Sequence, residues 1–305
     1  MVRTTASGQD GTAEPVPAVR VLGPVGMHRE GRLLAVGGPR TRRMLATLAL
    51  HADRPVPVPV LVESAWGAHP PRTWREQVHN CVVRLRRMLS GTADDVRLER
   101  VGAGYRLEIE VARVDAHAFT DDVARARRSA TAGDVAGAAA AIRIGLGRWY
   151  GDALGGDADG ALATAAAGLD ELRLAAFEDL FGHELALGNG TSVLTEITDL
   201  AARHPLREKL VLQAMTALRG AGRSAEALQT FRDHRRRMVH ELGLEPERAL
   251  RDLEVDILRG TGANGPAGPG EHLAADDRAG LAALLADLAS LAAEAARLLR
   301  ATTAG

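Results

Sequence analysis

The most constraining feature of this sequence is a change of periodicity near residue 113. From there to about residue 260, apolar residues recur at helical spacing, and no alternating strand pattern interrupts them. Glycine or proline separates the segments, as expected at helix ends. The sequence therefore predicts an all-α domain over residues 113–260. Its expected helices cover residues 116–132, 135–149, 159–187, 191–203, 206–220, 223–241 and 246–259.

A weak internal repeat refines this prediction. Gly188 and Gly222 stand 34 residues apart, which is the period of tetratricopeptide repeats. Ala227 followed by Phe231 fits the small-then-aromatic spacing of the second helix in such a repeat. Because the period is weak elsewhere, the helical domain is predicted to be TPR-like and no more than that.

The residues before 113 alternate between strand and helix signals. One hairpin is expected near the start and a second just before residue 112, and three helices are expected between them. Three helices flanked by hairpins predict an α+β winged helix-turn-helix domain over residues 19–112. The expected elements are a hairpin at Val19–Val36, a helix from about Arg40, an extended segment at Arg54–Pro59, helices at Val60–Trp66 and Thr73–Leu89, and a hairpin at Val96–Val111.

The two ends of the chain have a different character. Residues 1–18 are small and polar, which predicts a disordered tail, and residues 261–278 predict a flexible linker. Residues 279–300 predict one more helix, whose leucines and alanine recur at heptad spacing. The apolar stripe of this helix is wider than a two-stranded coil needs. Docking onto the helical domain or another multi-helix contact, a dimeric coiled coil and an unpacked helix all remain open for it.

The net charge of −1 conceals an uneven distribution. Residues 19–112 contain 15 arginines against 9 Asp or Glu, a balance of +6. Residues 113–260 contain 19 Arg or Lys against 23 Asp or Glu, a balance of −4. A basic first domain joined to an acidic second one suggests a nucleic-acid-binding module attached to another kind of domain.

Cysteine content and hydropathy suggest a compartment. Cys81 is the only cysteine, so no disulfide can form within the chain, as is usual in a reducing cytosol. The first fifteen residues contain no apolar core of a signal peptide, and charges interrupt every apolar stretch before it reaches a membrane-spanning length. These features predict a cytoplasmic location and no membrane partner.

The sequence offers no convincing catalytic or cofactor site. His79 and Cys81 are two residues apart and cannot share a helix face, so Cys81 is predicted to be a buried structural residue. Residues 157–160 begin like a calcium loop but lack its later oxygen ligands. Neither a complete dinucleotide-binding fingerprint nor a P-loop is present. We therefore expect a protein that is not an enzyme and needs no cofactor or metal.

The helix expected at Thr73–Leu89 carries the strongest functional signal. Its apolar residues form one stripe, and most of its arginines lie off that stripe. A helix of this kind fits the major groove of DNA, and a following β hairpin can reach the neighbouring backbone. Two other interpretations remain open. The helix can be a solvated basic helix beside an ordinary hairpin, or the chain can be a TPR-type scaffold whose basic N-terminal domain binds an acidic protein partner.

Longer motifs add a resemblance to known families. The run GGPRTRRMLATLALHADRPVPVPVLVESAWG, the basic helix and the VGAGYRL hairpin resemble the OmpR-type winged helix. GDVAGAAAAIRIGLGRWYGDAL and ARHPLREKLVLQAMTALRGAGRSAEALQTFRDHRRRMVHELGLEPERALRDLEVDIL resemble the bacterial transcriptional activator domain. Together, over about residues 19–260, they are similar to the Streptomyces antibiotic regulatory protein family.

This resemblance implies a partner set and a function. Family members activate secondary-metabolite (antibiotic) gene clusters, bind direct repeats in promoter DNA and recruit RNA polymerase holoenzyme. The resemblance therefore implies that this chain binds double-stranded DNA, contacts the polymerase and can self-associate on DNA.

The resemblance also assigns roles to single residues. Arg84 matches the base-facing position of the recognition helix, and Arg86 and Arg87 match positions that contact phosphates. His79 and Asn80 fall on the exposed face where sequence preference is set.

Other positions depart from the family pattern. Val83 stands where a polar or basic residue is common, and it can instead contact a thymine methyl group. The usual arginine of the wing is replaced by Val101, with Arg100 one place earlier and Glu99 beside it. The predicted DNA-binding residues are Arg75, His79, Asn80, Val83, Arg84, Arg86 and Arg87 on the recognition helix, and Arg42, Arg100 and Gly102 on the first helix and the wing.

Overall fold

The computed structural model describes residues 17–29, 32–90, 96–156 and 158–260. The tail predicted for residues 1–18 lies outside this range except for its last two residues, and the predicted linker and final helix lie wholly outside it. Among the helices in the described ranges, none is long and apolar enough to cross a membrane.

The N-terminal strands form a three-stranded antiparallel sheet in the order β1-β2-β3. Val19 pairs with Met27, and Met27 pairs in turn with Leu34. The prediction of a single hairpin was incomplete, because β1 is a separate strand that ends before Gly23 and Pro24. The bounds are β1 Val19–Arg20, β2 Gly26–Arg29 and β3 Arg32–Ala35.

Three helices and a second sheet follow. The sheet has the antiparallel order β4-β6-β5, so the segment predicted only as extended contributes a short strand beside the last hairpin. The helices are α1 Pro39–Leu50, α2 Val58–Trp66 and α3 Trp74–Leu89. The strands are β4 Val56–Pro57, β5 Arg97–Val101 and β6 Gly104–Glu108. A short 3-10 turn, η1 Val111–Arg113, occupies the end of the segment that the sequence predicted as strand.

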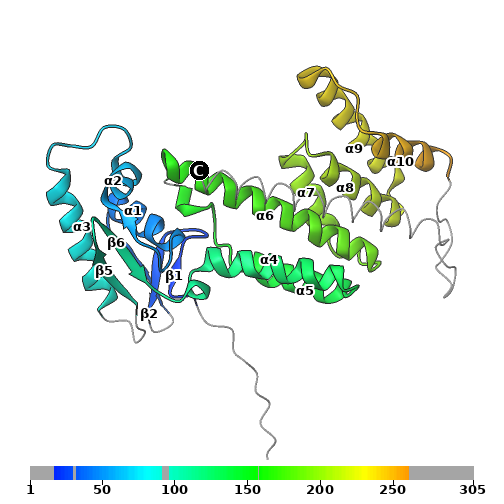
Figure 1. Ribbon diagram of the computed structural model, residues 1–305. Helices are drawn as coiled ribbons and strands as arrows, with labels where there is room; N and C mark the ends of the chain where they lie inside the picture. The colour runs from blue at the N-terminus through cyan, green and yellow to red at the C-terminus, as the bar shows by residue number, and fades with distance from the viewer. Residues whose placement is uncertain (1–16, 30–31, 91–95, 157, 261–305) are drawn as a thin grey trace, which may run out of the picture. The chain divides into compact units, whose positions relative to one another are not determined.

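The remaining described secondary structure is helical, as predicted, apart from isolated β-bridges at Val114 and Ala153. Helices α4 and α5 run side by side, and α6 packs against α5 (Figure 1). The bounds are α4 Asp115–Thr131, α5 Val135–Leu146, α6 Ala161–Ala186, α7 Leu194–Arg203, α8 Glu208–Gly220, α9 Ser224–Arg237 and α10 Arg248–Leu258.

Two predicted helices differ from the observed ones at their C-terminal ends. The segment expected at 135–149 stops being helical at Leu146, because Trp149 turns inward to pack edge-on against Phe119, 5.4 Å between ring centroids. The segment expected at 223–241 is α-helical only to Arg237 and continues as a π-helical turn, η3 Met238–Leu242, that ends at Gly243 with φ +69°. Glycine adopts this left-handed conformation without the steric cost of a Cβ.

The first strand connects the two predicted domains. The backbone N–H of Ala18 donates to the carbonyl of Arg113 (2.8 Å), and that of Leu154 donates to the carbonyl of Val21 (2.8 Å). Val19 also forms a parallel bridge with Val114. The buried apolar residues before and after residue 113 belong to one continuous core. The N-terminal segment is therefore packed against the helical region as well as against its own sheet.

Candidate nucleic-acid interface

Helix α3 has one buried face and one polar face. Val78, Cys81, Val82, Leu85 and Leu89 are buried. The predicted contact residues Arg75, His79, Asn80, Arg84, Arg86 and Arg87 are all exposed, and Val83 is half-buried. Successive residues of an α-helix rotate by about 100°, so Asn80, Val83 and Arg87 form the middle of the polar face.

The hairpin β5–β6 forms a wing beside α3 (Figure 1). Gly102, in its tip, has φ +55°, which suits the first central residue of a tight two-residue hairpin turn. The Nε of Arg86 donates to the carbonyl of Leu98 in β5 (2.9 Å). Arg86 therefore fixes the wing against α3 in addition to the phosphate role predicted for it. Arg100 and Gly102 are exposed.

An acidic side chain in the wing has a local partner. Glu99 stands directly across the hairpin from Arg106, and its Oε2 accepts a hydrogen bond from Arg106 Nη2 (3.2 Å). A carboxylate near DNA phosphates is repulsive, and the paired guanidinium reduces that repulsion. Both side chains are partly exposed, so the pair contributes little to stability.

The other flank of α3 faces the start of α1. Arg40 Nη1 donates to Gln77 Oε1 (2.8 Å), and Gln77 Nε2 donates to Thr73 Oγ1 (2.9 Å). Nη1 of Arg84 lies 3.8 Å from the position that a Cβ on Gly38 would occupy. Arg84 is thus placed beside the start of α1, on the flank of the polar face.

Arg40 and Gln77 were not among the predicted site residues. The two residues are 37 positions apart and lie on different helices, so no local spacing in the sequence indicates their contact. The Arg40 guanidinium also lies over the ring of Trp66, 5.5 Å from its centroid. Arg42, the predicted phosphate contact of the first helix, is half-buried.

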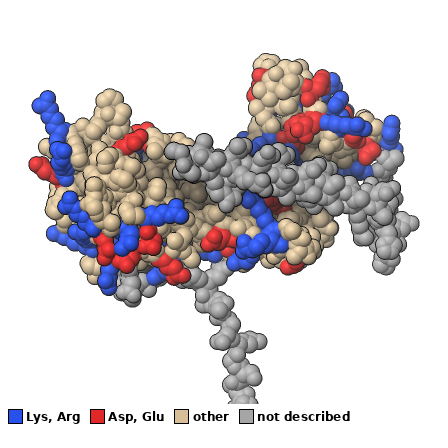
Figure 2. Space-filling model, viewed as in Figure 1, with Lys and Arg blue, Asp and Glu red and all other residues tan. Residues whose placement is uncertain are grey.

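Basic side chains gather where α3 lies, with acidic side chains among them (Figure 2). The exposed arginines on α3 and on the segments that contact it are Arg40, Arg72, Arg75, Arg84, Arg86, Arg87, Arg97 and Arg100. A surface with this charge and a protruding helix is suited to a polyanion such as DNA.

The described residues contain no cluster of three or more His, Cys, Asp or Glu that is placed to hold a metal ion. Cys81 is buried, as predicted, and its Sγ accepts a hydrogen bond from Thr41 Oγ1 (3.5 Å). Its position on the core face of α3 gives it a packing role.

A basic helix backed by a β hairpin and joined to a helical domain defines a two-part transcriptional regulator. Residues 114–258 match the bacterial transcriptional activator domain. Over 263 residues the chain is 34% identical to the regulatory protein DnrI of Streptomyces peucetius. The aligned region covers 82% of this chain and 96% of DnrI. The chain belongs to the Streptomyces antibiotic regulatory protein family.

Larger proteins share the same region. The regulatory protein AfsR of Streptomyces coelicolor is 34% identical over 240 residues, which are 78% of this chain and 24% of AfsR. The structure of Mycobacterium tuberculosis EmbR in complex with a low-affinity phosphopeptide superposes with a TM-score of 0.73 at 30% identity, covering 82% of this chain and 66% of EmbR. This likeness supports an OmpR-like N-terminal region followed by a helical domain.

Proposed function

We propose that this chain is a sequence-specific DNA-binding activator that binds promoter direct repeats through residues 19–112. The observation that carries the proposal is the polar face of α3, which projects its arginines and Asn80 away from the core beside the β5–β6 wing. An α-helix in the major groove reads base edges, while flanking cations hold the phosphates.

The roles of individual residues extend this proposal. Arg84 reads a base, Asn80 and His79 set sequence preference, and Val83 packs against a thymine methyl group. Arg75, Arg86 and Arg87 contact phosphates from α3, and Arg42, Arg100 and Gly102 contact the backbone from α1 and the wing. The exposed positions of most of these side chains support the assignment.

The helical region acts as the effector domain. Its match to the bacterial transcriptional activator domain supports recruitment of RNA polymerase holoenzyme by this TPR-like part of the chain. The family supports target genes for secondary-metabolite (antibiotic) biosynthesis. Direct repeats would seat two copies of the chain side by side, which is why we include self-association on DNA.

The decisive experiment is DNA binding as a function of salt. Promoter DNA from genes next to this one is titrated with the full chain, with scrambled DNA of equal length as the control. About four to six phosphate contacts give a slope of log K against log salt of roughly −4 to −5. Arg87→Gln should reduce the magnitude of this slope by about 1, because one phosphate contact is lost. Arg127→Gln changes an exposed position on α4 and should leave the slope unchanged.

The same titration tests the competing scaffold hypothesis. A slope near zero, or equal affinity for promoter and scrambled DNA, would contradict sequence-specific DNA binding. Binding of an acidic protein in place of DNA would then favour the scaffold.

A further inference from the structure

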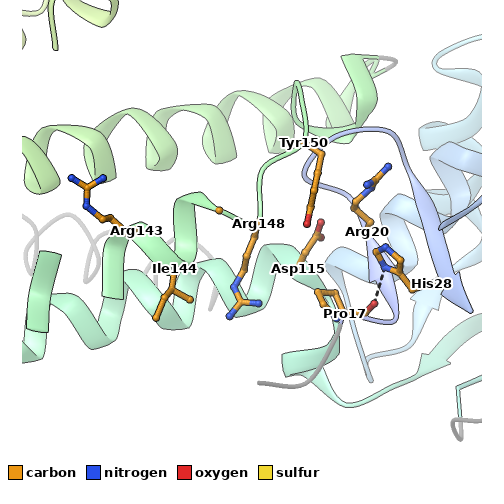
Figure 3. A pocket seen from close by; sticks show the side chains of 9 residues that line it. Pro17, Arg20, His28, Asp115, Arg143, Ile144, Arg148 and Tyr150 are labelled. Carbon is orange, nitrogen blue, oxygen red and sulfur yellow. Dashed lines mark hydrogen bonds between the residues drawn. The ribbon is translucent and has the colours of Figure 1, made fainter. Parts of the chain in front are cut away.

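A cavity of about 310 Å³ lies between the N-terminal sheet and the helices α4 and α5. The side of the cavity nearer the sheet is lined by Pro17, Arg20 and His28. The side nearer the helices is lined by Asp115, Ile144 and Arg148. Its volume is at the lower end of the range for small-molecule sites. Figure 3 shows Arg20, Tyr150, Asp115 and His28 around one space, while Arg143 points away from Asp115.

Arg20 is the arginine of this lining whose guanidinium has no hydrogen bond to a carboxylate among the described residues. Its Nε donates to the carbonyl of Pro24 (3.1 Å), and its guanidinium lies over the Tyr150 ring, 4.7 Å from the centroid. Within the described part of the chain, its two terminal nitrogens make no hydrogen bond. Stacking on Tyr150 holds the guanidinium in place, so an arriving anion would meet a preorganised pair of donors.

The other two arginines of the lining already have carboxylate partners. Arg143 Nη2 pairs with Glu184 (2.8 Å), and Arg148 Nε pairs with Asp122 (2.6 Å). These pairs leave Arg20 and the buried Asp115 as the remaining charged groups of the lining. One available guanidinium beside a buried carboxyl group favours a ligand with a single negative charge over a polyanion such as phosphate.

Asp115 forms part of the floor without competing fully for Arg20. Its Oδ1 accepts from the backbone N–H of Val21 (2.8 Å), and its Oδ2 accepts from that of Leu22 (3.0 Å). With both oxygens held by backbone donors, the carboxylate is not hydrogen-bonded to the guanidinium. The two terminal nitrogens of Arg20 therefore remain available to donate to another carboxylate.

The rim of the cavity is apolar and open. Tyr150 is 62% exposed and Ile144 is 42% exposed. Pro17 adds a third apolar surface. An aromatic ring or a short hydrocarbon body would cover these groups and gain by their removal from water.

We infer that this cavity binds a small apolar monocarboxylate, with Arg20 as the anchor of its carboxylate and Tyr150 and Ile144 as the seat of its apolar body. Such a ligand touches the N-terminal sheet and α5 at once, so its binding stabilises the arrangement of the two regions. Binding itself is independent of the proposed function; an effect of the ligand on DNA affinity would rest on it.

The test is isothermal titration calorimetry on the full chain without DNA. The probes are benzoate, its neutral counterpart benzamide, and inorganic phosphate. Saturable binding of benzoate is expected, with benzamide and phosphate at least tenfold weaker. Arg20→Gln should weaken benzoate binding at least tenfold, and Ile144→Ser, an exposed substitution that leaves Arg20 intact, should weaken it severalfold. Arg127→Gln keeps the wild-type affinity.

Three results would overturn the inference. These are no benzoate binding to the wild-type chain, equal binding of benzamide or phosphate, and unchanged benzoate affinity in both Arg20→Gln and Ile144→Ser. Because DNA is absent from this titration, its failure leaves the salt-dependent DNA experiment untouched. A failure of DNA binding likewise leaves the calorimetric result standing.

Discussion

Asp115, the first residue of α4, accepts hydrogen bonds from the backbone N–H groups of Val21 and Leu22, more than 90 residues earlier in the chain. The side chain is 1% exposed, so burial disfavours its charged form. One carboxylate thus satisfies two backbone donors of the segment after β1. It fastens the N-terminal sheet to the helical region.

This burial predicts a pH-dependent stability. Burial raises the pKa of Asp115 from its usual 3.8 to about 6, against the lowering effect of the two backbone hydrogen bonds. The folded state then binds the proton more tightly than the unfolded state. The stabilising contribution of the protonated carboxyl is complete below pH 3.8 and is lost as the pH rises through about 6. The full loss is about 3 kcal/mol.

Urea unfolding from pH 4 to pH 7.5 measures this loss when the wild-type chain is compared with Asp115→Asn, which does not titrate. The free energy of unfolding of the wild type should fall relative to the variant as the pH rises. Asp121→Asn, an exposed position on the same helix, is the matched control and should track the wild type. A difference between wild type and Asp115→Asn that stays constant with pH would contradict the assignment.

Arg86 and Arg84 are predicted to affect DNA binding differently. Arg84→Ala should cost about 1–3 kcal/mol on the true site and far less on random DNA. Arg86→Ala should weaken both DNAs about equally, because it removes a phosphate contact and the hydrogen bond to Leu98 that holds the wing. Fluorescence anisotropy with the two DNAs checks this; equal losses for both variants on both DNAs would refute the division of roles.

Local periodicity was sufficient to predict the three N-terminal helices and the wing. The stripe of apolar residues on α3 is a short-range pattern, and Gly102 marks the hairpin turn within the sequence itself. The strand β1 was not predicted as a separate strand, and β4 was predicted only as an extended segment. Each has two residues, which are too few for an alternating pattern.

Long-range contacts were beyond prediction for a different reason. The contact between Arg40 and Gln77 depends on how α1 packs on α3, and that between Asp115 and Val21 depends on the fold of the whole chain. The end of α5 at Leu146 is of this kind as well, since the inward turn of Trp149 is set by Phe119 on another helix.

Two glycines predict opposite effects of the same substitution. A Cβ on Gly104 would clash with the backbone carbonyl oxygen of Val56, so Gly104→Ala must push β4 away from β6. We expect this substitution to lower the free energy of unfolding by about 2 kcal/mol or more. Gly168 is exposed on α6, and no atom lies within 4 Å of the position of a new Cβ. Gly168→Ala should therefore raise the free energy of unfolding by about 0.5–1 kcal/mol. Urea unfolding distinguishes them, and a neutral Gly104→Ala would show that the β4–β6 pairing is not as close as described.

His234 predicts a stability effect confined to the helical region. It is 3% exposed, and its Nδ1 lies 2.8 Å from the carbonyl oxygen of Pro205 while its Nε2 lies 3.2 Å from Glu208 Oε1. The same Glu208 oxygen accepts from the backbone N–H of Glu247, just before α10 (2.8 Å). One imidazole therefore contributes to the attachment of α8, α9 and α10.

Replacing His234 with Phe keeps much of the volume but removes both polar contacts of the ring. We expect a loss of about 1–3 kcal/mol in the free energy of unfolding, because the half-buried carbonyl of Pro205 and carboxylate of Glu208 lose a hydrogen-bond partner in the core. His240→Phe, an exposed position in the following turn, should change stability by less than about 0.5 kcal/mol. DNA affinity should stay unchanged in both variants at temperatures where they are folded, since neither position lies near α3. An undiminished stability in His234→Phe would mean that packing of the ring, and not its hydrogen bonds, holds these three helices together.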